Sequence, residues 1–287
     1  MQHIVNSRTR YVLVHYRLFR TGGHVIDTIL EKNFFDSMAS ISGAGPNSTV
    51  TNVDLLEFLD PHPQISAISS YHLRPPKPEL DSYVFFDIFL LRDPLDRLYS
   101  IFEYHKQRSG ADPLDRLARE CELGEFLDKL VSDYPHFAND SQVCYLATSG
   151  RYFRPPDRQD LEKALTMLER AAVPATTSHF DEALVAAEYY LRPAFPNLDL
   201  SYVAPPRPSK GEYARPGSEY IKEACSRDTY RQVLQLAELD IELLNRASQE
   251  IWRRFKCIPN SDARLKDFRQ RCSTATEYFL EYDDVNA

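Results

Sequence analysis

The chain has 287 residues, of which 43% are hydrophobic and 26% are charged. This composition is typical of a globular protein, and the length is sufficient for one sizeable α/β domain. The formal net charge of −8 would repel DNA, RNA and anionic membranes, so we expect no nucleic-acid partner. Any anionic ligand must be held by a local basic cluster.

Cysteine usage and hydropathy exclude further classes. The five cysteines lie far apart and form no Cys-x-x-Cys pair, so we expect reduced thiols and no metal site. No stretch approaches about 18 uninterrupted apolar residues, the length of a membrane span, and the N-terminus lacks a long apolar core. We therefore expect a cytoplasmic protein without a membrane span.

The first part of the chain alternates predicted strands and helices. YVLVHY (Tyr11–Tyr16) is apolar and β-branched, and apolar residues then recur at helical spacing from Val25 to Leu30. The turn-rich stretch 40–52 precedes a short helix at 54–60 and a second strand within Gln64–His72, which a run of prolines ends.

YVFFDIFLL (Tyr83–Leu91) is the strongest predicted strand, and it runs into a helix with Pro94 in its first turn. The C-terminal half is predicted to be mostly helical, with one short strand within Ala172–Ser178. The helical patterns span 113–134, 157–171, 181–195 and 228–255, and the proline-rich stretch 204–217 is expected to be a loop.

These elements predict the fold class. Strands that alternate with helices favour a single α/β domain, in which helices flank a mainly parallel, P-loop-like sheet. In such folds ligands bind at the carboxyl ends of the strands. The candidate ligand-binding residues are therefore those that follow a strand.

The segment RLFRTGGHVIDTIL (Arg17–Leu30) places two glycines where the pattern changes from strand to helix. Backbone N–H groups at Thr21, Gly22 and Gly23 would point into an oxyanion, because glycine permits close approach and a helix begins there. Arg20 adds a fixed positive charge. The loop lacks the first glycine and the Lys-Ser/Thr pair of a Walker A motif, which disfavours an ordinary ATPase. Alternatively, the glycines only form a tight turn.

A second anion-binding element is FLLRDPLDRLYS (89–100). Arg92 leaves the end of the strongest strand, and Ser100 follows on the next helix, so a guanidinium and a hydroxyl could clamp one phosphate. Alternatively, the segment is a solvated turn in which Asp93 and Asp96 pair with a nearby arginine. Arg97 is the arginine that we expect in that pairing.

Together the two motifs resemble the 5′-phosphosulfate loop and the 3′-phosphate motif of sulfotransferases that use 3′-phosphoadenosine 5′-phosphosulfate (PAPS). The similar branch contains the Golgi carbohydrate sulfotransferases and their bacterial relatives. Its first loop usually reads P-K-T-G-G-T, where this chain has FRTGGH, and its second reads L-R-D-P-x-x-R-x-x-S, where this chain has LRDPLDRLYS. The resemblance continues at NDSQVCYL, TTSHFDEAL and LAELDIELLNRA, so it extends over roughly residues 10–256.

The resemblance implies an enzyme that transfers a sulfuryl group from PAPS to an acceptor hydroxyl and releases adenosine 3′,5′-bisphosphate. The acceptor would be a sugar, a small alcohol or a β-hydroxyacyl chain bound to a carrier protein. Arg20 would also stabilise the charge that develops on the bridging oxygen. The residues implied in donor binding are Arg20, Thr21, Gly22, Gly23, His24, Arg92, Ser100 and Arg207.

The chain departs from the family pattern at two positions. The loop lysine of the family is Arg20 here, and the small hydroxyl residue after Gly-Gly is His24. Arginine spreads its charge over a planar fork and stays protonated, so donor binding should survive while proton donation to the leaving group should not. Some bacterial sulfotransferase domains attached to polyketide synthases are similar in having arginine at this position.

A base must accept the proton of the acceptor hydroxyl. His72 ends the second predicted strand and resembles the histidine that follows the corresponding strand in the family, so it is the first candidate. His24 is the second candidate. His105 is the third, and we expect it rather to line the acceptor cleft. The remaining candidates are carboxylates: Asp27 and Glu31, which are expected to be solvated, and Glu57.

Two rival functions remain open from the sequence. A P-loop-type nucleotide kinase would share the scaffold, but it needs a loop lysine beside a magnesium-binding hydroxyl. A catalytically silent adenosine-bisphosphate-binding module would keep both phosphate sites and lack the base.

Overall fold

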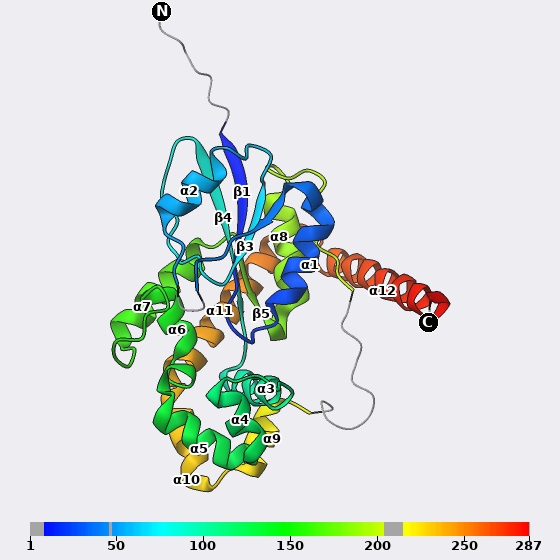
Figure 1. Ribbon diagram of the computed structural model, residues 1–287. Coiled ribbons are helices and arrows are strands. Elements are labelled where there is room, and N and C mark those ends of the chain that lie inside the picture. Colours follow the sequence, from blue (N-terminus) through cyan, green and yellow to red (C-terminus); the bar gives the residue numbers. More distant parts are fainter. Residues whose placement is uncertain (1–8, 46–47, 204–214, 287) are drawn as a thin grey trace, which may run out of the picture.

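The computed structural model describes residues 9–45, 48–203 and 215–286, and it is built around a five-stranded parallel sheet (Figure 1). The strands lie in the order β2-β3-β1-β4-β5. Their bounds are β1 (Arg10–Tyr16), β2 (Met38–Ser40), β3 (Ala67–Ser70), β4 (Tyr83–Leu91) and β5 (Val173–Thr176). The predicted fold class, a single α/β domain with a parallel sheet flanked by helices, is confirmed.

β1 lies at the centre of the sheet and is buried on both faces. Val12 and Val14 pack into one apolar cluster, and Leu13 packs into another on the opposite face. Side chains alternate along a strand, so an unbroken apolar run is needed only where both faces are covered. The parallel register pairs Leu13 with Ala67 of β3 and with Phe86 of β4.

Helices cover both faces of the sheet. One face is covered by α1 (Gly23–Phe34), α8 (Phe180–Leu191) and α12 (Ser261–Asn286). The other is covered by α2 (Asn52–Leu59), α6 (Ser141–Ala147) and α7 (Arg158–Arg170). The long helix α11 (Glu238–Cys257) contributes side chains to both clusters.

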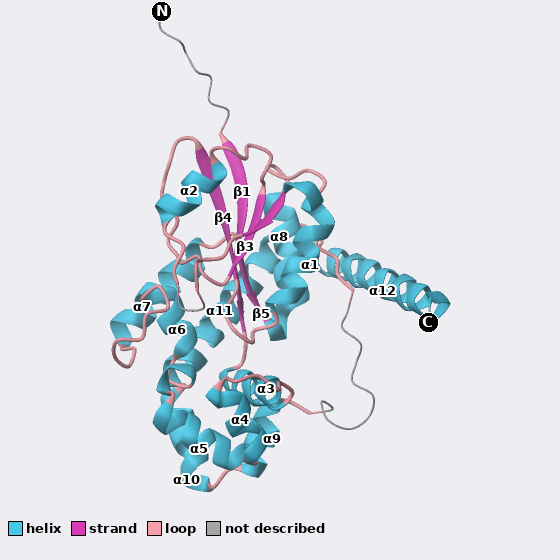
Figure 2. Cartoon of the chain, viewed as in Figure 1, coloured by secondary structure: helices cyan, strands magenta, loops and turns pink. Residues whose placement is uncertain are grey.

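A helical layer lies beyond the carboxyl ends of the strands (Figure 2). It has its own apolar cluster, which includes Leu98, Phe126 and Ile221. Its helices are α3 (Pro94–Lys106), α4 (Pro113–Glu120), α5 (Leu123–Asp133), α9 (Gly217–Ala224) and α10 (Arg227–Leu236). Short 3₁₀ turns complete the described chain: η1 (Phe35–Ser37), η2 (Pro135–Phe137) and η3 (Thr177–His179).

The structure differs from the predicted elements at several helix boundaries. The pattern 113–134 is two helices, because the chain is extended at Cys121 and Glu122. The pattern 228–255 divides at Ala237 into α10 and α11. β2 and α12 were not predicted, since β2 has three residues and α12 packs only part of its surface.

Two further observations concern composition. All five cysteines are free thiols, as the sequence predicted. Each helix in the described ranges is either too short or too polar to cross a lipid bilayer.

Candidate functional site

A cleft with a volume of about 1430 Å³ lies at the carboxyl ends of the strands. Its walls come from the loop after β1, the segment after β3, the cleft-facing side of α3, and the segment from η2 through α6 to Tyr152. This is the edge at which ligands bind in parallel α/β folds.

The cleft is basic although the chain carries a formal charge of −8. Among the described residues that line it are six arginines and four histidines, and Asp112 is the one carboxylate. The arginines are Arg17, Arg20, Arg74, Arg92, Arg97 and Arg151. Such a local cluster can hold an anion that the protein as a whole would repel.

The two predicted anion-binding motifs meet in this cleft. Arg20 Nε donates a hydrogen bond to Ser100 Oγ at 3.0 Å, and Arg92 Nη1 donates to the Arg20 carbonyl at 3.4 Å. The Arg20 guanidinium also lies 5.0 Å from the centroid of the Tyr104 ring. The structure therefore brings Arg20, Arg92 and Ser100 together although they come from different elements.

The loop after β1 turns sharply into α1. Arg20 and Gly22 both have left-handed backbone conformations, with φ of 64° and 92°. A left-handed conformation is costly for a side chain other than glycine, and it persists at Arg20 only because the surrounding contacts fix the loop. Gly22, Gly23 and His24 line the cleft, so the N–H groups at the start of α1 face it.

Thr21 has a different position from its neighbours. It is buried, and its hydroxyl donates to the Leu18 carbonyl at 3.1 Å, which closes the loop on itself. Its side chain therefore serves the turn, and the predicted contribution to donor binding is limited to its backbone N–H.

A buried polar network lies beneath the loop. A Cβ on Gly23 would lie 3.1 Å from Cε1 of His15, so a side chain larger than hydrogen would crowd this ring. His15 Nδ1 lies 2.9 Å from Asp27 Oδ1, and Arg17 pairs with the same carboxylate at 3.1 Å. Ser69 of β3 also donates to it. The expectation that Asp27 is solvated is wrong, because it ties α1 to β1 and β3.

Burial and hydrogen bonding determine the protonation states of His15 and Asp27. Burial lowers the pKa of His15, which favours the neutral ring. Burial would raise the pKa of Asp27, but the hydrogen bonds from His15 and Ser69 outweigh it and lower that pKa. The anionic Asp27 therefore anchors the start of α1 without a charged histidine.

Arg92 is positioned through its backbone. Gln142 accepts from the Arg92 N–H at 3.0 Å and donates from Nε2 to the Arg92 carbonyl at 2.9 Å. Asp240 in turn accepts from the N–H groups of Gln142 at 3.1 Å and Val143 at 2.8 Å, at the start of α6. Asp140 accepts from the Asp240 N–H at 2.8 Å, at the start of α11.

The two aspartates thus cap each other's helices. Burial raises the pKa of Asp240. Burial and the neighbouring Asp240 together raise the pKa of Asp140 to about 7. The negative charge of Asp240 therefore favours the protonated form of Asp140.

The three supporting segments of the family resemblance converge on Arg92. Gln142 belongs to NDSQVCYL and Asp240 to LAELDIELLNRA, and both lie in the network that holds the Arg92 backbone. Thr177 and Ser178, from TTSHFDEAL, line a hollow of about 460 Å³ that Arg92 also lines.

Arg97 does not form the predicted pairing with Asp93 and Asp96. It is buried and donates to the carbonyls of Phe19 at 2.9 Å and Phe137 at 3.0 Å. It also donates to Ser141 Oγ at 2.6 Å. Burial lowers the pKa of Arg97 to about 10, so the guanidinium remains charged at neutral pH.

The two aspartates have other roles in the fold. Asp93 caps α3 by accepting from the N–H groups of Leu95 and Asp96 at 3.0 and 2.9 Å. Asp96 accepts from the Ser218 N–H at 2.8 Å and so holds α9 against α3. The solvated-turn interpretation of this segment is therefore wrong.

His72 and His24 both line the cleft. His72 Nδ1 lies 2.8 Å from the Gly43 N–H, which donates to it. His24 is exposed at the start of α1. Their catalytic roles stay predictions. The carboxylates of Glu31 and Glu57 do not line the cleft, and Arg207 lies outside the described residues.

His105 and Asp115 form a buried pair that the sequence did not predict. His105 Nδ1 lies 2.7 Å from Asp115 Oδ1. No local sequence pattern predicts this pair, because the two residues are ten positions apart and lie on different helices. Of the described residues, no three His, Cys, Asp or Glu side chains are grouped so that they could hold a metal ion.

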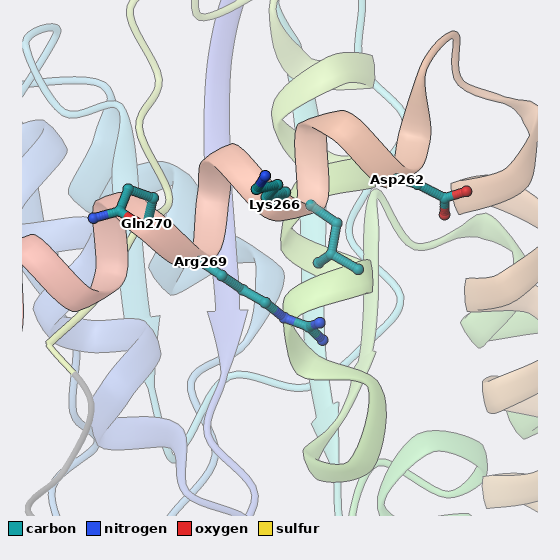
Figure 3. Close-up of a pocket in the computed structure, with 5 residues that line it drawn as sticks. Asp262, Lys266, Arg269 and Gln270 are labelled. Carbon is teal, nitrogen blue, oxygen red and sulfur yellow. The ribbon is translucent and has the colours of Figure 1, made fainter.

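A separate hollow runs along α12, with a volume of about 370 Å³ (Figure 3). Its lining comes from one helix, and its arginine, Arg269, already pairs with Asp181 and Glu182. It lacks the converging groups of the main cleft, so we place the functional site in the cleft.

No protein-family model matches the sequence. The chain is similar to an uncharacterized protein of Archaeoglobus fulgidus, with 22% identity over 246 residues that cover 82% of this chain and 94% of the relative. That relative's name carries no activity, so the function has to be inferred from the site.

The conformation of Gly22 can be tested by substitution. We expect Gly22→Ala to lower the free energy of unfolding by about 1–2 kcal/mol, because alanine at a φ of 92° is strained while the nearest atom, Leu90 Cδ2 at 3.8 Å, leaves room for the methyl group. Urea unfolding measures the change. Gly45→Ala is the control, since a Cβ there meets no atom within 4 Å; equal losses in both variants would contradict the assignment.

The aspartate pair predicts a pH dependence of stability. Because the folded pKa of Asp140 is about 7, above its ordinary value of 3.8, the free energy of unfolding should fall as pH rises from about 4 to 7. The slope from this group is at most about 1.4 kcal/mol per pH unit. Asp140→Asn keeps the acceptor oxygen and tolerates the left-handed backbone, so it should flatten the slope.

Urea unfolding at pH 5 and pH 8 measures that difference. Asp228→Asn is the matched control, because the Asp228 side chain is 92% exposed. An unchanged slope in Asp140→Asn would show that the pKa of Asp140 is not raised in the folded protein.

Proposed function

We propose that the protein is a PAPS-dependent O-sulfotransferase. The observation that carries the proposal is the convergence of the two motifs: Arg20 donates to Ser100, and Arg92 donates to the Arg20 carbonyl, within one basic cleft. A donor with a phosphosulfate on the 5′ carbon and a phosphate on the 3′ carbon of one ribose needs two anion sites within one cleft. A turn without a ligand would not require the two motifs to meet.

The 5′-phosphosulfate would bind at the N-terminus of α1. The N–H groups of Gly22 and Gly23 and the Arg20 guanidinium would hold its oxygens. The 3′-phosphate would bind Arg92 and Ser100. Ser100 accepts from Arg20 and therefore keeps its own O–H free to donate to a phosphate oxygen.

Sulfuryl transfer would then be in-line. The acceptor oxygen forms a bond to sulfur while the bond from sulfur to the bridging oxygen breaks, and the electron pair stays on the departing adenosine 3′,5′-bisphosphate. Arg20 would stabilise that charge, and positioning and electrostatics would supply most of the rate enhancement, as in phosphoryl transfer.

The sequence of the loop after β1 also bears on the rival functions. After the second glycine the loop has His24 and Val25 where a P-loop kinase has its lysine and hydroxyl pair, which counts against the kinase. A silent binding module would keep the donor site and transfer nothing. The acceptor that we propose is a sugar, a small alcohol or a carrier-bound β-hydroxyacyl chain.

Two measurements together test the proposal. Isothermal titration with adenosine 3′,5′-bisphosphate measures donor-site binding, and mass spectrometry of acceptor mixtures with PAPS detects sulfated products. Binding with transfer supports the enzyme, and binding without transfer to any acceptor class supports the silent module. Magnesium-dependent ATP turnover would support the kinase instead.

Arg92 provides a prediction about the donor. We expect Arg92→Ala to weaken adenosine 3′,5′-bisphosphate binding by about tenfold to 100-fold, since each charge-assisted hydrogen bond to the 3′-phosphate contributes about 1.5–3 kcal/mol. Binding of adenosine 5′-phosphate should change far less. Arg116→Ala, an exposed position on α4 outside the cleft, is the control. Equal weakening of both nucleotides would place the 3′-phosphate elsewhere.

Arg20 provides a prediction about turnover. We expect Arg20→Ala to lower turnover by about 10²–10³, the effect of removing one preorganised oxyanion donor, with a smaller loss of donor affinity. Arg20→Lys restores the residue usual in the similar family, so it should recover much of the activity. Steady-state rates and donor titrations measure both effects, and a loop that is only a turn would tolerate either change.

A further inference from the structure

One histidine in the cleft has a buried ring nitrogen without a partner. His105 is 4% exposed and lines the cleft, and its Nδ1 lies 2.7 Å from Asp115 Oδ1. Asp115 is fully buried. Nε2 of His105 is shielded from solvent and has no hydrogen-bond partner among the described residues. A buried polar atom normally finds a partner, so this nitrogen indicates a position for a ligand group.

The aspartate fixes which nitrogen carries the proton. A carboxylate only accepts hydrogen bonds, so Nδ1 of His105 must be protonated, and in the neutral ring Nε2 keeps its lone pair. His72 has the opposite arrangement. The Gly43 N–H donates to its Nδ1, so the proton of the neutral His72 ring is on Nε2.

The location of His105 suits a role beside the phosphosulfate. Its ring packs edge-on against Tyr104, with centroids 5.0 Å apart, and lies 6.3 Å from the ring of Phe19, the residue before Arg20. The guanidinium of Arg20 lies over the ring of Tyr104 at 5.0 Å. His105 and Arg20 therefore approach the same tyrosine.

We propose that His105, oriented by Asp115, accepts the proton of the acceptor hydroxyl at Nε2. The proposal rests on the proposed sulfotransferase function. As the acceptor oxygen bonds to sulfur, its O–H bond breaks and the proton forms an imidazolium on His105. Asp115 stabilises that cation through the Nδ1–H hydrogen bond, in the manner of an aspartate that supports a catalytic histidine. His72, with Nε2–H, donates a hydrogen bond to a ligand oxygen.

The charged groups around the pair are few. Arg108 Nε lies 3.5 Å from the second oxygen of Asp115, and Asp112 at the start of α4 lines the cleft nearby. Arg108 is half-exposed, so solvent screens its charge more than that of the buried carboxylate. The direct hydrogen bond from Asp115 is therefore the main influence on the His105 ring.

The test compares His105→Asn with His72→Asn in the full chain. Asparagine at 105 can still donate to Asp115 but cannot accept a proton, so turnover with PAPS should fall by about 10²–10⁴. Adenosine 3′,5′-bisphosphate affinity should stay within twofold, which verifies folding and the donor site. His62→Asn is the control and should keep full turnover, because His62 lies beside Arg10 at the amino end of β1 and does not line the cleft.

Asp115→Asn is the second variant, because it leaves His105 in place and removes only the charge that orients it. It should lower turnover by about tenfold or more and shift the acidic limb of the pH–rate profile, which a purely structural change would not move. Nitrogen-15 NMR spectra of the wild-type histidines measure the tautomers directly and do not depend on turnover. They should show Nε2 unprotonated in neutral His105 and protonated in neutral His72.

The outcomes separate the two proposals. Full activity in His105→Asn, or a large loss confined to His72→Asn, overturns the role of His105 and leaves the sulfotransferase in place. Bisphosphate binding by the wild-type protein without transfer to any acceptor overturns both. Loss of turnover in His105→Asn with retained donor affinity and the expected tautomers supports the proposal.

Discussion

The geometry of the cleft depends on a buried arginine that belongs to neither end of the predicted donor site. Arg97 donates to the Phe19 carbonyl in the loop after β1, to the Phe137 carbonyl in η2 and to Ser141 at the start of α6. These bonds join the loop that contains Arg20 to the helices on the opposite wall. A buried charge that loses such partners is costly, so the three segments are held together whether or not a ligand is bound.

A second constraint fixes Arg92, the other residue that the sequence predicts to bind an anion. Gln142 holds the Arg92 backbone through both the oxygen and the nitrogen of its side-chain amide, and Asp240 holds the start of α6 that carries Gln142. The capping is reciprocal, because Asp140 accepts from the start of α11. Burial raises the pKa of both carboxylates, so the hydrogen bonds that position Arg92 depend on the protonation of two groups that do not line the cleft.

In two histidines of the cleft, the hydrogen bond at Nδ1 decides whether Nε2 carries the proton. His72 accepts from a backbone N–H, and His105 donates to a carboxylate. The same side chain is therefore a donor toward the cleft in one position and an acceptor in the other. In the proposed reaction both are useful, since a sulfuryl transfer needs a donor at ligand oxygens and an acceptor for the proton of the nucleophile.

The sequence by itself determined the fold class and located the two segments that we predict to bind anions, because apolar strands, helical spacing and the strand-to-helix glycines are local patterns. The sequence also correctly predicted which residues lie together at one edge of the sheet: Arg20, Gly22, Gly23, Arg92 and Ser100. Only the tertiary structure decided that Arg97 and Asp27 are buried supports and that His105 is paired with Asp115. Those roles depend on partners from other elements, 10 to 78 residues away in the chain, and no local pattern records such a contact.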